Sequence, residues 1–209
     1  MSPEVRILRS DNPEAAQLRA QGWRVIGESW GARLFLDDDV TALRQALART
    51  QGRTLTDAAG TDHTIHIRAL TPADAVAYLA LERANAEDYP TGPAVDTPPL
   101  DEPTVRTHLG SDTWFFAGAW TDSGHLIAAS ANFACPDRWE VDRTSVLSGW
   151  RGRGLGGAVK AFSLLHLHAR GVRCFGTGGA GVNEASLAMN RALGFTIEGI
   201  YYSLAPPLD

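Results

Sequence analysis

The sequence has few cysteines and no long hydrophobic run. Only two cysteines, Cys135 and Cys174, occur in 209 residues, and two are too few for a disulfide framework. Cys174 falls in a short apolar segment and is expected to be a packed free thiol. The longest mostly apolar stretch, residues 126–135, is interrupted by Ser130 and Asn132 and is too short to cross a bilayer. The sequence therefore predicts neither a disulfide-stapled domain nor a membrane-spanning segment.

Clusters of positive charge are also missing. The formal net charge is −5, and no run of lysine and arginine appears, so neither a nucleic acid nor an anionic membrane is expected as a partner. The six histidines show no metal-ligand spacing, so no metal site is expected. Glu4, Arg6 and Arg9 lie close to the start, which is unlike a secretory signal peptide. We therefore expect a cytoplasmic protein.

Glycines, in contrast, are concentrated in one stretch. Residues 151–157 read Arg-Gly-Arg-Gly-Leu-Gly-Gly, with four glycines in seven positions. Residues 141–147 alternate as a strand does, and residues 158–170 carry apolar side chains at helical spacing before Gly171. The glycines are therefore predicted to form a strand-to-helix turn. Its backbone N–H groups and the positive end of the helix would favour a phosphate or pyrophosphate.

Three interpretations of this turn can be compared with its sequence. Close packing of a helix against a strand would need the glycines without any ligand. A P-loop would need a lysine followed by serine or threonine after the glycines, and this pair is missing. Residues 152–157 do fit the dinucleotide-binding pattern, but they lie late in the chain, and the next acidic residue is Glu184.

A second segment distinguishes between these interpretations. Residues 183–195 read Asn-Glu-Ala-Ser-Leu-Ala-Met-Asn-Arg-Ala-Leu-Gly-Phe. The order Arg151-x-x-Gly154-x-Gly156, then a helix, a short strand, Asn183 and a helix ending in Leu-Gly-Phe resembles the GCN5-related N-acetyltransferase (GNAT) superfamily. The resemblance covers residues 64–205 and is nearest, in motif spelling, to mycothiol-synthase-like and tandem GNAT proteins.

The resemblance implies an α/β fold with a mixed, mostly antiparallel twisted sheet and helices on both faces. The element order expected for the catalytic domain, residues 63–209, is β-α-α-β-β-β-α-β-α-β-β. Residues 51–62 are polar, with glycines and several threonines, and are expected to be a linker.

Residues 1–50 resemble the end of the same domain. Segment 22–27 aligns without a gap with segment 194–199, at an offset of 172 residues. This predicts a degenerate GNAT-like repeat of strand, helix, strand and strand, followed by a helix. Chance similarity of two helix–turn–strand units is the alternative. Because this part has no glycine-rich turn, we expect packing or homodimerisation there and no cofactor.

The resemblance also implies where acetyl-CoA binds. Backbone groups near Val146 and Leu147 would pair with the pantetheine arm, and the amides of the glycine turn would hold the pyrophosphate. The implied cofactor-binding residues beyond those two are Arg151, Gly152, Arg153, Gly154, Leu155, Gly156, Gly157, Asn183 and Asn190. The side chains of Arg151 and Arg153 would add positive charge, or serve solubility alone. Lys160, one turn further on, is expected at the surface.

Two asparagines allow a second interpretation each. Asn183 stands where the family has an asparagine that contacts pantetheine, but asparagine is also a preferred helix N-cap. Asn190 stands where many members have a tyrosine thought to protonate the departing thiolate. An amide cannot usefully supply a proton, although it can hydrogen-bond the thiolate or pantetheine. Water or another residue would then have to be the acid.

Candidates for the general base lie on the strand before the glycine turn. Glu140 precedes Arg151 by eleven residues, the offset at which histone-acetyltransferase-type members carry their base. Asp142 is expected on the same strand face, because side chains alternate with a period of two. One of these carboxylates could accept the amine proton. A solvated strand face is the alternative.

The implied activity is direct transfer of acetyl from acetyl-CoA to a primary amine of a small molecule. The loop Ala84–Pro99 should border the acceptor cleft, and its polar residues would favour a cationic amine. The candidate substrate-binding residues are Glu87, Asp88 and Tyr89. The missing tyrosine and the shortened repeat suggest an alternative function, a non-catalytic acyl-CoA-binding or regulatory protein.

Overall fold

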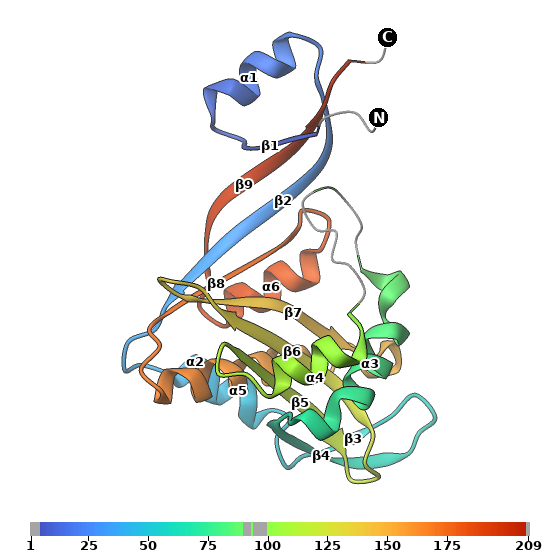
Figure 1. Ribbon diagram of the computed structural model, residues 1–209. Helices are drawn as coiled ribbons and strands as arrows, with labels where there is room; N and C mark the ends of the chain where they lie inside the picture. Colours follow the sequence, from blue (N-terminus) through green and yellow to red (C-terminus); the bar gives the residue numbers. More distant parts are fainter. Residues whose placement is uncertain (1–4, 90–92, 94–99, 208–209) are drawn as a thin grey trace.

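The strands of the protein form one continuous sheet (Figure 1). The computed structural model describes residues 5–89, 93 and 100–207, and within them the strand order is β1-β9-β2-β8-β7-β6-β5-β4-β3. Neighbouring strands are antiparallel except β7 and β8, which are parallel. The mixed, mostly antiparallel sheet predicted from the sequence is therefore confirmed.

The elements have the following bounds. The strands are β1 (Arg6–Arg9), β2 (Arg24–Phe35), β3 (Thr54–Thr56), β4 (Asp62–Ala69), β5 (Trp114–Thr121), β6 (Leu126–Ala134), β7 (Trp139–Val146), β8 (Cys174–Ala180) and β9 (Thr196–Ala205). The α-helices are α1 (Pro13–Ala20), α2 (Thr41–Ala48), α3 (Ala75–Ala84), α4 (Glu102–Leu109), α5 (Leu155–Ala169) and α6 (Glu184–Ala192). The short 3-10 helices are η1 (Pro72–Asp74), η2 (Ala86–Asp88) and η3 (Ser148–Trp150).

Side-chain caps fix the start of several helices. The Asn12 side chain accepts a hydrogen bond from the backbone N–H of Glu14, and the Asp101 side chain accepts one from Thr104. Each cap satisfies a donor that the first helical turn leaves free. At the other end, α5 stops before Gly171, whose φ of +94° is readily adopted only by glycine.

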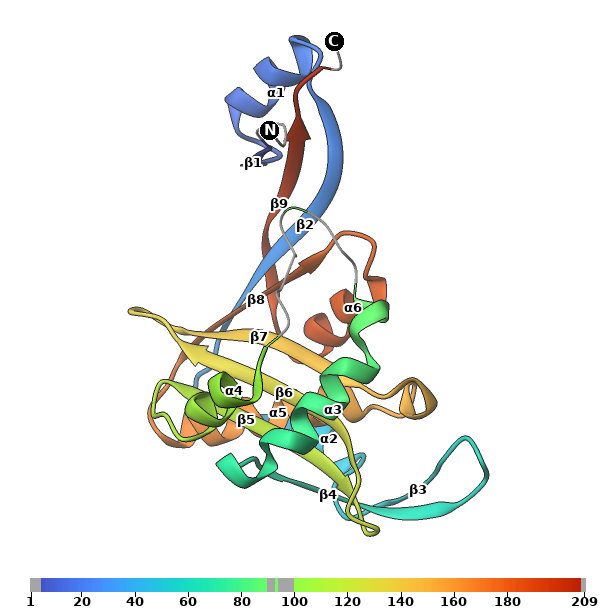
Figure 2. The same cartoon turned by 45° about the vertical axis from the view of Figure 1, so that its right-hand side comes forward.

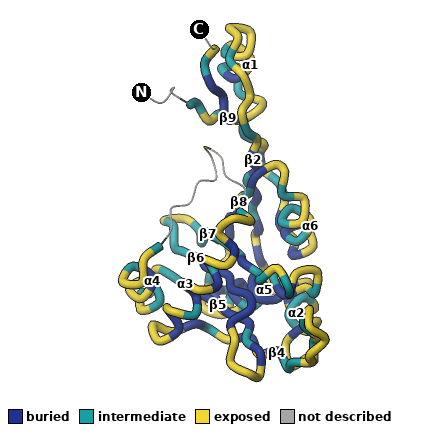
Figure 3. The backbone as a smooth tube through the Cα atoms, turned by 90° about the vertical axis from the view of Figure 1, so that its right-hand side faces the viewer, coloured by how far each residue is buried: buried dark blue, intermediate teal, exposed yellow. Residues whose placement is uncertain are grey.

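Helices cover both faces of the sheet (Figures 1 and 2). Phe115 and Phe116, which are neighbours on β5, point to opposite faces, as alternation in a strand requires. Phe115 packs with α5 and α2, whereas Phe116 packs with α3 and α4. Buried residues concentrate around β5 and α5, and the far end of the sheet, near α1, is largely exposed (Figure 3). No helix among the described residues is long and apolar enough to cross a membrane.

The N-terminal part contributes a strand inside the sheet. Strand β2 lies between β8 and β9 and pairs with both. The repeat was predicted to contain two consecutive strands after its first helix, but they are this single strand, and β9 likewise replaces the two strands predicted at the end of the catalytic domain. Glycines such as Gly27 do not end the strand, because it continues through a β-bulge and a Cβ on Gly27 would only touch Ser203.

Strands β2 and β9 pair in a register that is symmetric about Ser29 and Tyr201. These two residues are partners and stand 172 positions apart in the sequence. For every other pair, adding 172 to the number of the β2 residue and subtracting 172 from that of the β9 residue gives another pair of the same ladder. The matched pairs are Arg24–Ala205 with Arg33–Thr196, Val25–Leu204 with Ala32–Ile197, Gly27–Ser203 with Gly31–Gly199, and Glu28–Tyr202 with Trp30–Ile200. The ladder therefore has an approximate two-fold axis.

The same offset relates features outside the paired residues. One bulge skips Ile26 on β2 and the other skips Glu198 on β9. Gly22 and Gly194, which follow α1 and α6, have φ values of +89° and +95°. The helix–turn–strand geometry of the N-terminal segment is thus repeated at the C-terminal end.

The predicted linker, residues 51–62, is not an unstructured connection. It contains β3, which pairs antiparallel with the start of β4, as in Thr54 with Thr64. Polar composition suggested a loop, but the threonines are compatible with a strand at the sheet edge, where one face and one edge meet water.

Candidate functional site

Strands β7 and β8 stay together over only two residue pairs. Trp139 is opposite Phe175, and Glu140 is opposite Gly176. Beyond this point β7 continues along β6, and β8 continues along β2. The two strands diverge (Figure 1), so among the described residues their facing edges have no strand partner. Backbone N–H and C=O groups there can pair with an extended ligand.

The glycine turn follows the end of β7. Gly152 and Gly154 have φ values of +77° and +78°, in the left-handed region that favours glycine. Gly154 is the N-cap of α5 and provides no side-chain cap, and the first turn of α5 contains no acidic residue. The first N–H groups of this helix thus keep their positive partial charge, which favours an anion.

Gly156 has a packing role in the same stretch. A Cβ on this residue would lie 3.2 Å from Met189 Sδ and 3.4 Å from Val146 Cγ2. Its absence lets α5 approach α6 and β7 closely. A Cβ on Gly152, in contrast, would meet nothing within 4 Å. Close packing of a helix against a strand therefore explains Gly156 but not Gly152.

Arg151 ties the turn to the end of α3. Its Nε donates to the carbonyl oxygen of Val146 (3.0 Å), and its Nη2 donates to Asn85 Oδ1 (2.8 Å). The same Nη2 forms an ion pair of 2.6 Å with Asp88. One of the predicted cofactor-binding residues is thus in contact with one of the predicted substrate-binding residues.

Arg153 ties the other side of the turn to β3. Its Nε donates to the carbonyl oxygen of Thr56 and its Nη1 to that of Gly149, each at 2.9 Å. Both arginines therefore brace the turn through donated hydrogen bonds. The charge of Arg151 is paired with Asp88, whereas Arg153 has no carboxylate partner among the described residues. Solubility alone therefore does not explain why Arg151 and Arg153 occur in this turn.

Glu140 lies at the point where β7 and β8 part. A Cβ on Gly176 would overlap the Glu140 carboxylate, so the carboxylate lies across the backbone of β8. Its Oε1 accepts a hydrogen bond from Arg138 Nε, and the Glu140 side chain is 21% exposed. This predicted base is therefore partly buried and ion-paired beside the divergence of the strands.

Asp142 occupies a β-bulge. Val141 and Arg143 pair with consecutive residues of β6, so Asp142 has no partner across the ladder. Its Oδ2 accepts a hydrogen bond from Arg143 Nε at 2.7 Å. Asp142 was predicted to share a strand face with Glu140 because side chains alternate with a period of two. The bulge interrupts that alternation.

A buried polar cluster beside this site was not predicted. Glu82 of α3 accepts hydrogen bonds from Ser145 Oγ and, at 3.3 Å, from Arg143 Nη1, both on β7. Tyr89 donates to Glu82 at 3.4 Å and is also hydrogen-bonded to Ser145. Burial raises the pKa of Glu82, and burial followed by the Glu82 charge raises the pKa of Tyr89 to about 12. The spacing carried a signal, because Glu82 follows buried Tyr78 by four residues on the same helix face.

The predicted acceptor loop, Ala84–Pro99, is described in part. Glu87 is exposed, Asp88 pairs with Arg151, and Tyr89 belongs to the Glu82 cluster. Residues 90–92 and 94–99 of this loop lie outside the described residues. The substrate-binding role of the three named residues stays a prediction.

The two asparagines of the second motif make defined contacts. Asn183 Oδ1 accepts a hydrogen bond from Ser186 N at 3.0 Å, which confirms its N-cap role on α6. Asn190 is fully buried, accepts from Lys160 Nζ at 2.7 Å, and donates from Nδ2 to the Ser186 carbonyl. The cofactor contacts expected of both asparagines stay predictions.

The surface position expected for Lys160 is wrong. This side chain is only 2% exposed and points from α5 toward α6. Helical spacing explains the difference, because Lys160 lies four residues after Gly156 and four before buried Leu164. It therefore belongs to the buried stripe of α5 despite its charge.

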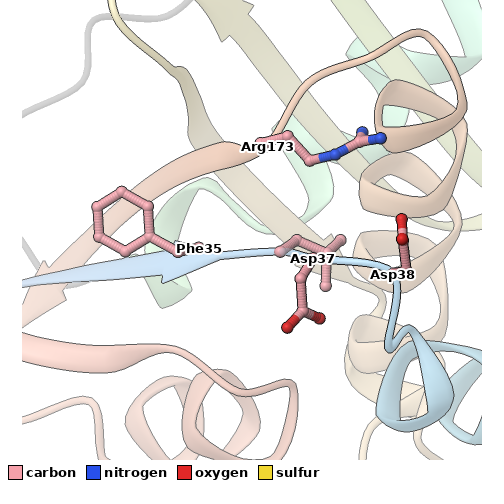
Figure 4. A pocket seen from close by; sticks show the side chains of 5 residues that line it. Phe35, Asp37, Asp38 and Arg173 are labelled. Atoms are coloured by element: carbon pink, nitrogen blue, oxygen red, sulfur yellow. The ribbon is translucent and has the colours of Figure 1, made fainter.

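Two shallow hollows on the described surface lie away from the diverging strands. One is lined by Gln45, Ala48, Arg49 and Arg53. The other is lined by Phe35, Leu36, Asp37, Asp38 and Arg173 (Figure 4). Neither contains a predicted site residue. Within the described ranges, no three His, Cys, Asp or Glu side chains are grouped so that they could hold a metal ion.

The arrangement of strands and helices is that of the GNAT fold. The structure matches the crystal structure of a GCN5-related N-acetyltransferase from Sphaerobacter thermophilus, with a TM-score of 0.70 and 19% identity, over 98% of this chain and 61% of that one. A GNAT-family acetyltransferase from Colwellia psychrerythraea matches with a TM-score of 0.61 and 14% identity, over 95% and 64%. The fold predicted from the two motifs is therefore confirmed.

A third similar structure is described as a tandem GNAT protein from the clavulanic acid biosynthesis pathway. Its TM-score is 0.58 at 24% identity, over 99% of this chain and 64% of that one. This chain thus spans less than two thirds of the length of these three proteins. No family model matches the sequence, and no curated protein matches it.

Proposed function

We propose that the protein is an acyl-CoA-dependent N-acetyltransferase that transfers acetyl from acetyl-CoA to a primary amine of a small molecule. The observation that carries this proposal is the divergence of β7 and β8 directly after Glu140 and Gly176, with an uncapped helix start at the end of β7. The unpaired strand edge suits an extended amide-bearing arm. The helix start suits a pyrophosphate.

Acetyl-CoA would be held mainly by backbone groups. Those of Val146 and Leu147 would pair with pantetheine, and the N–H groups of residues 151–157 would bind the pyrophosphate. Support comes from the positive φ of Gly152 and Gly154 and from the absence of a side-chain cap at α5. The charges of Arg151 and Arg153 add attraction for the phosphates.

Glu140 would be the general base, and Asp142 the alternative. An ammonium must lose a proton before its nitrogen can attack the thioester, and a carboxylate beside the reacting centre can accept it. The assignment of Glu140 as the base is supported by its position where β7 and β8 begin to diverge. Attack by the bound amine on the thioester carbonyl completes the transfer in one ternary complex.

The proposed acceptor is a small cationic amine. Acidic side chains lie near the diverging strands. Glu82 and Asp142 both form ion pairs with Arg143, and Glu87, two residues before Tyr89 in the sequence, is exposed. The acidic side chains outnumber this one arginine, and the surplus of negative charge would attract an ammonium and would help to bind it before deprotonation.

The experiment combines binding with turnover. Isothermal calorimetry should show binding of CoA and acetyl-CoA and none of NAD, and a panel of small amines should then be assayed for release of free CoA thiol. A protein that binds neither CoA compound contradicts the proposal. Tight CoA binding with no acetylated amine would instead support the alternative, a non-catalytic acyl-CoA-binding protein, which the asparagine at position 190 favours.

We also propose that residues 1–50 are a degenerate GNAT-like repeat, followed by a connection over residues 51–62 and a catalytic domain over residues 63–209. The symmetric register about Ser29 and Tyr201 supports this division. The repeat would act by packing, because β2 fills the place between β8 and β9 in the sheet of the catalytic domain.

A further inference from the structure

Lys160 is a buried cation that has no anionic partner within the part of the chain that the structure describes. Its Nζ donates to Asn190 Oδ1 at 2.7 Å and to Thr177 Oγ1 at 3.4 Å, and it lies 5.6 Å from the centroid of the Phe195 ring. All three partners are neutral. Buried lysines normally have a carboxylate partner, so the packing of the protein alone gives no reason for this one.

The environment of Lys160 weakens its hold on a proton. Burial lowers its pKa from 10.5 to about 7, and burial is the whole cause. No ionisable side chain of α5, α6, β8 or β9 contributes among the residues that the structure describes. Lys160 can therefore exist in both protonation states near neutral pH, as a proton donor must.

Thr177 links Lys160 to the diverging strands. It directly follows Gly176, the last residue of β8 that pairs with β7. Its hydroxyl accepts the hydrogen bond from Lys160, and no acceptor for the hydroxyl hydrogen is found within the described parts of the chain. That hydrogen can therefore be directed at a group between the strands.

The two faces of the sheet differ at this point. The Glu140 carboxylate lies across Gly176 on one face, and Thr177 points to the other, because successive strand residues alternate. The Glu140 carboxylate thus lies on the α3 side of the sheet, and the Lys160 ammonium, linked to the Thr177 hydroxyl, lies on the α5 side. This is the separation that a transfer with one proton acceptor and one proton donor requires.

We propose that Lys160 supplies the proton for the departing thiolate and that the Thr177 hydroxyl passes it on; this role rests on the proposed acetyl transfer. When the carbon–sulfur bond breaks, its electron pair goes to sulfur. Sulfur takes the hydroxyl proton of Thr177, whose oxygen takes one from Lys160 Nζ. Lys160 is left neutral and regains a proton from water.

Asn190 positions the ammonium in this arrangement. Its Nδ2 donates to the carbonyl oxygen and to Oγ of Ser186, so its Oδ1 faces Lys160. The asparagine that cannot supply a proton itself thereby orients a group that can.

The test measures the thiol of bound CoA, which needs no acceptor amine. The thiolate is titrated by its ultraviolet absorbance in complexes of CoA with the wild type, Lys160→Met and Thr177→Val. The free thiol titrates near pH 8.5, roughly the reference for cysteine. An ammonium nearby should lower that pKa in the wild-type complex, and Lys160→Met should raise it again by about 1–3 units. Thr177→Val keeps the charge and should change the thiol pKa less. In a separate assay with an accepted amine, this variant should slow the release of thiol from acetyl-CoA.

Equal thiol pKa values in wild-type and Lys160→Met complexes of equal CoA affinity would overturn the role of Lys160 and leave the proposed function intact. If Lys160→Met does not fold, the Lys160 Nζ is titrated by NMR in the wild type with and without CoA. Formation of the thiolate should raise the pKa of Lys160, and an unchanged titration would overturn the role. A wild type that does not bind CoA would contradict the proposed function itself.

Discussion

The Glu140 carboxylate lies against the Cα of Gly176, in the space that a side chain on that residue would occupy. The two residues form the last pair between β7 and β8. Glu140 can reach across the backbone of β8 only because Gly176 has no Cβ. The position of the proposed base therefore depends on a glycine outside the glycine turn.

Replacing Glu140 by Gln should remove the proton acceptor and keep the shape of the side chain. Turnover with an accepted amine should fall by about 10²–10⁴-fold, the usual range for general acid–base catalysis. CoA affinity in calorimetry should be unchanged, because the proposed cofactor contacts are backbone groups elsewhere. The loss should shrink at high pH, where more of the amine is already deprotonated. Near-full turnover of this variant together with an inactive Asp142→Asn would assign the base to Asp142.

The variant Gly176→Ala should displace the Glu140 carboxylate without touching its chemistry. Its new Cβ would overlap only the end of a flexible side chain, so the cost in stability should be small. Turnover should approach that of Glu140→Gln, and the double variant should be no slower than Glu140→Gln alone, because both changes remove one interaction. Additive losses in steady-state assays would show that Gly176 acts independently of Glu140.

The variant Gly154→Asp should abolish binding of CoA. It puts a carboxylate at the start of α5, where the pyrophosphate is proposed to bind, and repels it. Gly171→Asp is the matched control, because Gly171 lies at the other end of the same helix with a similar φ, +94° against +78°. Both variants carry the strain of a positive φ, but only the first should lose CoA affinity in calorimetry. Equal affinities in both variants would move the cofactor site away from the turn.

Much of this fold was predictable because its signals are local. The glycine turn between residues 151 and 157 and the motif between residues 183 and 195 each specify a turn, a helix start and a helix end. These features depend on neighbours in sequence. The order of elements from β4 to β9, apart from the splitting of β9, could therefore be predicted without the structure.

The parts that were not predictable depend on distant contacts. The bulge at Asp142 adds a residue to β7 relative to β6, and period-two alternation carries no sign of it. Lys160 and Glu82 lie on buried helix faces, where charged side chains are rare. Contacts distant in sequence, from Ser145 and Arg143 to Glu82 and from Asn190 to Lys160, place these two side chains in the interior.

Strand β2 should contribute strongly to stability, since it is an inner strand of the sheet. Trp30 is 3% exposed, belongs to the α5-side core and donates from Nε1 to the Ala180 carbonyl. Trp30→Ala should lower the free energy of unfolding by about 3–5 kcal/mol. Phe35, on the same strand, is 74% exposed, and Phe35→Ala should cost less than about 0.5 kcal/mol. Urea unfolding of the two variants measures both values, and similar losses would contradict the inner position of β2.

Lys160 should make the stability of the protein depend on pH in an unusual direction. Its pKa is lowered from 10.5 to about 7 in the folded state by burial, so between these values the unfolded chain binds more protons than the folded chain. The free energy of unfolding should therefore rise with pH across this window, by up to about 1.4 kcal/mol per pH unit for one proton. The stability from this group is present at high pH and is lost as the pH falls toward 7.

Lys160→Met provides the reference for this measurement, because it isolates the contribution of Lys160 from that of every other group in the protein. Urea unfolding of both proteins at pH 7, 8 and 9 gives the difference in stability at each pH, from which the shared titrations cancel. The advantage of Lys160→Met over the wild type should be largest at pH 7 and should decrease as the pH rises, since releasing the Lys160 proton on folding costs less free energy as the pH approaches the unfolded pKa of 10.5. Curves that stay parallel would show that Lys160 keeps an ordinary pKa in the folded protein, and the proton-donor role would lose its physical basis.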